Sequence, residues 1–289
     1  MTIAVVSSLA VATTLVVLKI WAWRATHSVA MLSSLADSVL DLVASALTFF
    51  AVRVALTPAD REHRFGHGKS EGLAAIVQSL IIAGSAGFVA FRAIVRLITP
   101  EEVATPAIGY VVMAIALLLS SGLVLLQRRV VHQTDSLAVR ADAAHYKADI
   151  ATNVAVIVAI ALNDRLGWLY ADPILALLIV AVILSSVLEI LRSALRDLLD
   201  HELPTEARRR IKTVVLEHPE VRGVHDIRTR SSGLTQFIQL HLELDSGLTL
   251  DRVHAISDNI DRQLRSAFPR AEILIHADPY GLRERRDEF

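Results

Sequence analysis

The sequence has no cysteine among its 289 residues, and it has only 12 glycines and 8 prolines. Without cysteine there is neither a disulfide framework nor a zinc-thiolate site, so any metal must be held by histidine, aspartate or glutamate. The composition also excludes a collagen-like or disordered chain. The formal net charge is -1, from 29 basic and 30 acidic residues. The chain therefore has no excess of positive charge to attract a polyanion, and we expect no nucleic-acid partner.

Hydrophobic residues make up 53% of the chain, and the mean hydropathy is +0.49. A soluble globular domain rarely averages that apolar, so we predict a membrane protein. Four runs have almost no charge, and two weaker apolar segments carry ionisable residues; each is long enough to cross a hydrocarbon core of about 30 Å. Together they predict six membrane spans, at residues 2–18, 26–52, 72–91, 103–127, 136–162 and 173–190.

The first apolar run is followed by basic and aromatic side chains, Lys19, Trp21, Trp23 and Arg24. We interpret these residues as an interfacial belt at the end of a membrane helix. A cleaved signal peptide is the alternative interpretation. It requires a basic leader before the run and a small-residue cleavage site after it, and neither is present.

Lysine and arginine are concentrated in two connections, those after the second and fourth spans (Arg53, Arg61, Arg64, Lys69; Arg128, Arg129, Arg140). The turns at 101–102 and 163–165 have few basic residues. Because basic connections stay on the cytoplasmic side, we expect both termini to be cytoplasmic.

The composition changes after Leu199, which predicts a membrane domain over 1–200 and a soluble domain over 201–289. Helical periodicity and period-two alternation in the second part predict a helix, two strands joined by a Ser-Ser-Gly turn, a helix and a third strand. Their expected ranges are 205–218, 224–230, 234–244, 250–268 and 271–277. The order αββαβ predicts a small α+β domain with its helices on one face of the sheet.

Two spans carry ionisable residues four positions apart: Asp37 and Asp41 in the second, and His145 and Asp149 in the fifth. Residues at this spacing share one face of a helix. An aspartate near the bilayer centre costs about 2.5–3.5 kcal/mol, and it normally faces a cavity, a partner or an ion. A buried structural pair is the alternative, but two matching pairs favour a metal site. Three carboxylates and one imidazole suit a tetrahedral divalent cation such as Zn²⁺.

Two further groups are candidate metal ligands. Asp60, His63 and His67 follow the second span with Asp-x-x-His-x-x-x-His spacing, although solvated loop histidines are common. The soluble domain contains the other group, His225, His241, His254, His276 and Asp278. Single histidines in such a domain are more often surface residues than ligands. However, several of these lie on predicted strands, so the group could converge on one site.

Three segments, HSVAMLSSLADSVLD, FGHGKSEGLAA and ADAAHYKAD, precede a histidine-bearing αββαβ tail. This pattern resembles the cation diffusion facilitator family through nearly the whole chain. The resemblance implies an all-α transmembrane domain of six helices, a C-terminal cytoplasmic α+β domain of ferredoxin-like, metallochaperone-like fold, and a homodimer. It also implies a multi-pass protein of the bacterial cytoplasmic (inner) membrane.

By the same resemblance, the paired residues of spans two and five match the family's transport site, and the loop triad matches a second site. The group in the soluble domain matches a binuclear zinc site. Two departures from the family pattern are that Met1 lies almost at the start of the first span and that Ala277 replaces a glutamine. The position of Met1 leaves the exact start of the chain undecided. The alanine at 277 puts in question the contacts that would orient the cytoplasmic ligands.

We therefore expect a secondary transporter, not an enzyme, that exports a divalent metal in exchange for protons. Zn²⁺ is the expected substrate and regulatory ion, with Cd²⁺ and Fe²⁺ as further candidates. A proton-coupled exporter of organic cations is one alternative, but it needs aromatic walls, and spans two and five offer few aromatics beyond Phe49, Phe50 and Tyr146. A membrane-anchored metal sensor is another, and it leaves the four charged residues of the spans unexplained.

Overall fold

The computed structural model describes residues 1–27, 29–99, 107–166, 168 and 170–281. The chain divides into two compact units, Met1–Leu195 and Arg196–Phe289. The division falls in the last turns of the sixth helix, close to the boundary at residue 200 that the change of composition predicts.

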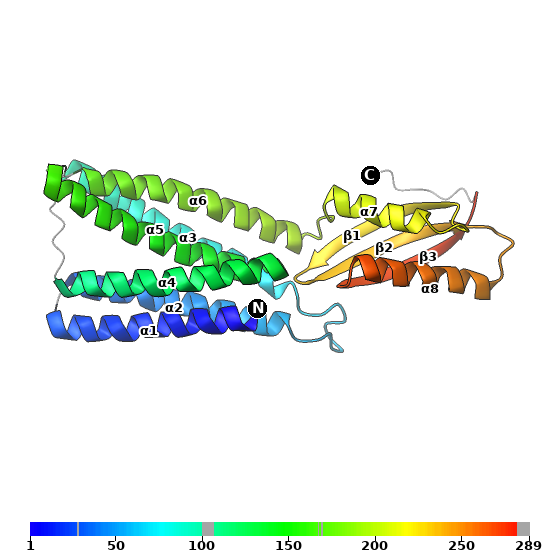
Figure 1. Cartoon of the computed structure of the whole chain (residues 1–289), viewed down its shortest axis with the longest axis horizontal. Coiled ribbons are helices and arrows are strands. Elements are labelled where there is room, and N and C mark those ends of the chain that lie inside the picture. Colours follow the sequence, from blue (N-terminus) through cyan, green and yellow to red (C-terminus); the bar gives the residue numbers. More distant parts are fainter. Residues whose placement is uncertain (28, 100–106, 167, 169, 282–289) are drawn as a thin grey trace. The chain divides into compact units, whose positions relative to one another are not determined.

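Six long helices build the first unit (Figure 1). They are α1 (Thr2–Thr26), α2 (Val29–Ala55), α3 (Ser70–Ile98), α4 (Ala107–Thr134), α5 (Leu137–Leu166) and α6 (Ala171–Leu198). Within the described residues, five of them are long and apolar enough to cross a membrane, and α5 is the exception. Helix α5 has the required length, but ionisable residues lower its hydropathy. The prediction of a helical transmembrane domain is confirmed, with six long helices in the predicted order.

The helices extend beyond the uncharged runs that predicted them. Helix α1 continues to Thr26, so Lys19 lies within the helix and not at its end. Helix α5 continues to Leu166, so the prediction of a turn at 163–165 is wrong. A helix in a membrane keeps its backbone hydrogen bonds internal, whether or not a side chain is charged, so charge alone does not end it. Residues 103–106 of the predicted fourth span lie outside the described residues.

Small side chains form much of the contact between these helices. Ala4 of α1, Ala74 of α3 and Ala138 of α5 are buried in one cluster, and Ala75 of α3 and Ala141 of α5 in another. Ile190 and Ala194 of α6 join this second cluster. Small residues let helix backbones approach closely, which drives packing where lipid surrounds the helices. The large apolar side chains are thereby left to face outward.

The second unit has the predicted order αββαβ. Its elements are α7 (Thr205–Leu216), β1 (Gly223–Ser232), β2 (Thr235–Leu244), α8 (Leu250–Ala267) and β3 (Ala271–Pro279). The sheet order is β1-β2-β3, with β1 and β2 antiparallel and β2 and β3 parallel. Gly233 turns the chain between β1 and β2 at a φ of 58°, a conformation that favours glycine.

The core of this unit lies between one face of the sheet and its two helices. Ile238, Leu240, Leu242 and Leu244 alternate along β2 and are nearly fully buried. They pack against Ile211 and Val215 of α7 and Ile256, Ile260 and Leu264 of α8. Alternation along the strand leaves the polar side chains, among them His241, on the opposite face. The α+β prediction is confirmed, including the face that the helices cover.

Candidate metal centres

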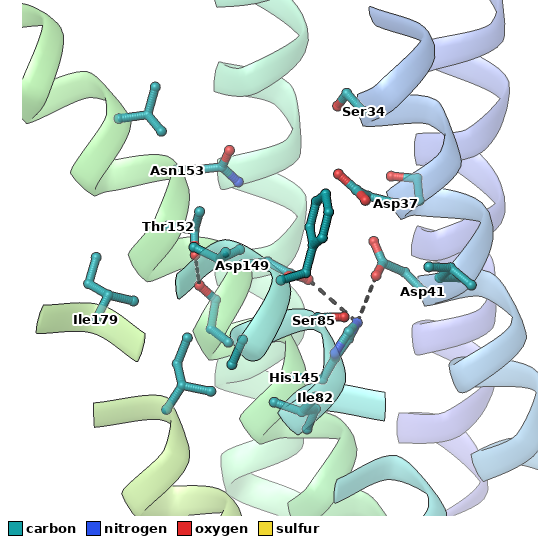
Figure 2. A pocket seen from close by; sticks show the side chains of 18 of the residues that line it. Ser34, Asp37, Asp41, Ile82, Ser85, His145, Asp149, Thr152, Asn153 and Ile179 are labelled. Carbon is teal, nitrogen blue, oxygen red and sulfur yellow. Dashed lines mark hydrogen bonds and ion pairs between the residues drawn. The ribbon is translucent and has the colours of Figure 1, made fainter. Parts of the chain in front are cut away.

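A cavity of about 560 Å³ lies inside the first unit, and all six long helices contribute to its lining. Figure 2 shows Asp41 of α2 and His145 and Asp149 of α5 pointing toward one another in this cavity. The His145 Nε2 atom lies 2.8 Å from Asp41 Oδ1 and 3.8 Å from Asp149 Oδ2. One potential ligand atom of each residue lies within 4.8 Å of the others, a spacing that one metal ion can bridge.

Asp37 lies one helical turn before Asp41 on α2 and lines the same cavity (Figure 2). Its side chain is exposed, and it is not part of the close group of three. The structure therefore brings together three of the four residues predicted for the membrane site and places the fourth in the same cavity. Both pairs lie on common helix faces, as their spacing predicts.

Hydrogen bonds to neighbouring helices hold α5 in place beside the site. The hydroxyl of the buried Tyr146 lies 3.0 Å from Ser45 Oγ on α2 and donates to the Ser8 carbonyl on α1 at 3.2 Å. Asp142, one turn before His145, is 1% exposed. Its Oδ2 accepts hydrogen bonds from Ser8 Oγ at 2.6 Å and from Gln127 Nε2 at 2.7 Å.

Asp142 and Lys19 are residues that sequence reasoning missed. The signal for Asp142 was available, because it is a charged residue within a span, like Asp37. Lys19 was interpreted as part of an interfacial belt, and that interpretation is wrong. Its side chain lines the cavity and is half-buried, and its Nζ donates to Ser38 Oγ at 2.6 Å. The belt pattern misleads because the long side chain of a lysine can extend either toward water or into a polar cavity.

The second candidate centre lies in the connection between α2 and α3. The two oxygens of Asp60 lie 3.4 Å from His63 Nδ1 and 3.5 Å from His67 Nε2. Asp60 Oδ1 also accepts hydrogen bonds from the backbone N–H groups of His63 and Glu62, at 2.6 and 2.9 Å. The hydrogen bond from His63 is the main cause that lowers the pKa of Asp60. The structure brings these three predicted residues together, and the lowered pKa of Asp60 favours the ionised carboxylate that a metal ligand requires.

The third centre lies on the polar face of the sheet in the second unit. His225 of β1 pairs with His241 of β2, which pairs with His276 of β3, so three imidazoles lie in a row across the strands. Asp278 Oδ2 lies 2.8 Å from His241 Nδ1 and 3.5 Å from His225 Nε2. Its Oδ1 lies 3.0 Å from His276 Nε2. Imidazoles around a shared carboxylate form a donor set that suits Zn²⁺.

His254, the fifth residue predicted for this centre, is not brought to the others. It lies on α8, its side chain is 76% exposed, and its Nε2 is 3.7 Å from Asp258 Oδ2. Two acidic residues near the histidines were not predicted as ligands. Glu243 Oε1 lies 3.0 Å from His225 Nδ1, and Asp226 groups with His225 and His241. Glu243 shares a strand face with His241, a signal in the sequence, whereas Asp226 depends on an irregularity in β1 that the alternation pattern does not predict.

Apolar helices surround a cavity lined by candidate metal ligands, and a second domain carries further candidate ligands. This arrangement is typical of a membrane transporter of metal cations. Residues 5–199 match the family model described as the cation efflux transmembrane domain, and residues 203–280 match the cation efflux protein, cytoplasmic domain. The chain belongs to the cation efflux family, the cation diffusion facilitators. It is a multi-pass membrane protein of a family of transporters.

The relatives of the chain are cation-efflux pumps of the FieF and YiiP type. The cation-efflux pump FieF of Shewanella oneidensis is 44% identical over 273 residues, which cover 94% of this chain and 92% of that protein. FieF of Pectobacterium atrosepticum is 46% identical over 278 residues, covering 96% and 92%. The solved structure of CzrB in its Zn form is 33% identical, with a TM-score of 0.28, and covers 30% of this chain and 99% of that chain.

Proposed function

We propose that this protein exports Zn²⁺ from the cytoplasm in exchange for protons. The observation that carries the proposal is the group formed by Asp41, His145 and Asp149 inside a cavity that all six long helices line. With Asp37 in the same cavity, the site offers three carboxylates and one imidazole. That donor set fits a tetrahedral divalent cation, and the imidazole favours zinc and cadmium over harder ions such as manganese.

Competition for the same four side chains supplies the coupling to protons. A metal ligand must be deprotonated, so a bound divalent cation requires ionised carboxylates and a neutral His145. Protons that return to these groups disfavour the metal by the same amount that the metal disfavours them. If the cavity opens to one side of the membrane at a time, this competition becomes an exchange of metal for protons.

We propose that the second unit binds zinc and that the bound zinc strengthens a homodimer. The matched family model of this region bears the name ZT_dimer, which supports dimerisation. The row of histidines spans all three strands, so a bound zinc ion would tie β1, β2 and β3 together. We propose that both termini are cytoplasmic and that the protein resides in the bacterial inner membrane, as the distribution of basic residues and the bacterial relatives indicate.

Flux measurements in vesicles test the transport function directly. The purified full-length protein is reconstituted, and uptake of Zn²⁺, Cd²⁺, Fe²⁺ and Mn²⁺ is followed with and without an imposed pH gradient. We expect zinc flux that accelerates when protons move in the opposite direction. Zinc flux that is independent of the pH gradient would show that the protein is a uniporter and not an antiporter. Flux of organic cations without metal flux would overturn the assignment of the substrate.

A further inference from the structure

Lys19 of α1 occupies a specific place in the membrane cavity. Its Nζ donates hydrogen bonds to the Ser34 carbonyl at 3.1 Å and to Ser38 Oγ at 2.6 Å. Both acceptors belong to α2, the helix that carries Asp37 and Asp41. The ammonium group is therefore held against the helix that supplies two of the four ligands predicted for the membrane site.

The charges that face this ammonium group come from two other helices. It interacts electrostatically with Asp37 and Asp41 of α2 and with Asp149 of α5. Asp172 of α6 also lines the cavity, but it is paired with Arg96 of α3 at 2.5 Å. Both hydrogen bonds of the ammonium group go to neutral oxygens, and within the described part of the chain no carboxylate oxygen lies within 4.0 Å of its Nζ. Lys19 is thus near the ligand carboxylates without being bonded to them.

The separation between the Lys19 ammonium group and the carboxylates is informative, because a direct ion pair would be the stronger interaction. Attraction between opposite charges rises as they approach, most steeply where water is scarce. A lysine present only to neutralise the carboxylates would bond to one of them and would occupy an oxygen that a metal needs. The Ser34 carbonyl and Ser38 hydroxyl instead satisfy two of the three N–H donors of Lys19 and keep the carboxylate oxygens available.

We infer that Lys19 is a tethered counter-cation of the membrane metal site, an inference that rests on the proposed function. With the three aspartates as ligands and His145 neutral, the charges of these four ligands, one divalent cation and the Lys19 ammonium sum to zero. A net charge inside a membrane is costly. This balance therefore lowers the free energy of the protein while the cavity encloses the cation between its two open states. The same ammonium repels the bound cation, so Lys19 lowers metal affinity and speeds metal release.

Zinc binding to purified full-length protein tests this role. The measurements use a background in which His67→Ala, His241→Ala and His276→Ala remove ligands outside the cavity, so that calorimetry reports on the membrane site. We expect Lys19→Gln to tighten zinc binding by about tenfold or more, because a repelling charge near a divalent cation is removed. Lys19→Arg should stay close to the background protein. Arg24→Gln is the matched control, since it removes an exposed positive charge from the same helix.

The hydrogen bond between Lys19 and Ser38, the tether, allows a second test in which the expected change in zinc affinity has the opposite sign. Ser38 is 1% exposed, and Ser38→Ala removes the hydroxyl that holds the ammonium group while the charge remains. The released ammonium group can then contact a carboxylate directly and compete with the metal, so zinc binding should weaken. A merely structural Lys19–Ser38 contact would shift both variants in the same direction. In vesicles, Lys19→Gln should lower both KM and kcat for zinc, because release becomes slower.

Asp149→Ala in the same background separates this inference from the proposed function. If Asp149→Ala binds zinc as well as the background protein, the membrane site itself is misassigned. If Asp149→Ala loses zinc binding but Lys19→Gln binds no more tightly than the background protein, the counter-cation role is overturned and the transport function stands. Unchanged or tighter binding by Ser38→Ala would overturn the tether.

Discussion

His145 Nε2 lies 2.8 Å from Asp41 Oδ1, although 104 positions separate the two residues in the chain. This contact joins α2 to α5 in the cavity (Figure 2). The imidazole nitrogen that faces the carboxylate is the atom that would bind a metal. A cation bound at the proposed site would replace the contact between these two residues with bonds to each of them. Metal binding would then depend on the distance between α2 and α5.

Removal of one ligand from the membrane site should abolish transport. We expect Asp41→Ala or Asp149→Ala to lose zinc flux in vesicles, since the remaining ligands fit the ion poorly. The zinc binding proposed for the second unit should persist, because its candidate ligands belong to another unit than Asp41 and Asp149. Glu189→Ala is the control, because it removes an exposed carboxylate of α6 that does not line the cavity. Wild-type zinc flux in either aspartate variant would show that the membrane site is misassigned.

The residue at position 145 should govern metal choice. His145→Asp gives the site only carboxylate ligands, which suit harder ions, so we expect the ratio of manganese to zinc flux to rise. Competition between the two metals in the same vesicles measures the ratio without depending on the amount of active protein. A ratio equal to that of the wild-type protein would argue against a role for His145 in selectivity.

The buried Asp142 should stabilise the first unit through the hydrogen bonds that its carboxylate accepts. Asp142→Leu removes the acceptor of the buried hydrogen bonds from Gln127 Nε2 and Ser8 Oγ and should cost about 1–3 kcal/mol. Asp142→Asn keeps the shape and an acceptor oxygen, and should retain most of the stability. Thermal unfolding in detergent compares the two variants with the wild-type protein. Equal melting temperatures for the leucine and asparagine variants would contradict the hydrogen-bond role.

Zinc should stabilise the second unit, which has its own hydrophobic core. We expect zinc to raise the melting temperature of the fragment 203–289, because the metal binds the folded arrangement of the strands. His241→Ala should remove most of that rise, since His241 lies between the other two histidines of the row. His254→Ala should remove less, since its side chain is 76% exposed on α8. Equal melting temperatures with zinc and with chelator would rule out a regulatory zinc site.

The ion pair between Glu220 and Arg252 should make the stability of the second unit depend on pH. Arg252 donates hydrogen bonds to the Glu220 carboxylate, one of them over 3.0 Å, and these lower the pKa of Glu220. A lowered pKa in the folded state adds stability above the unfolded-state pKa of 4.5, and this is lost as the pH falls through the folded-state pKa.

Arg252→Gln should therefore lower the melting temperature of the second unit near neutral pH. The difference from the wild-type protein should shrink as the pH falls below about 4, where Glu220 becomes protonated in both. Arg262→Gln, which removes another arginine from the exposed face of α8, serves as the control. A difference that stays constant from neutral pH to acid would show that the ion pair is not its cause.

The sequence by itself determined the elements of the fold and the chemistry of the ligands. Long apolar runs must become helices in a bilayer, because only internal hydrogen bonds satisfy the backbone there. Alternation along β2 fixed which face would be buried against helices. The four-residue spacing placed Asp37 with Asp41, and His145 with Asp149, on common helix faces.

Only the tertiary structure decided which of these faces meet. The sequence predicts that Asp41 and His145 each lie on a polar face, but packing of α2 against α5 brings the two side chains into contact. Pairing of β2 with both neighbours places three histidines from distant segments in one row and leaves His254 apart on α8. Packing also turned Lys19 into the cavity. Local patterns report only the period of an element, whereas contacts between elements depend on how their surfaces fit together.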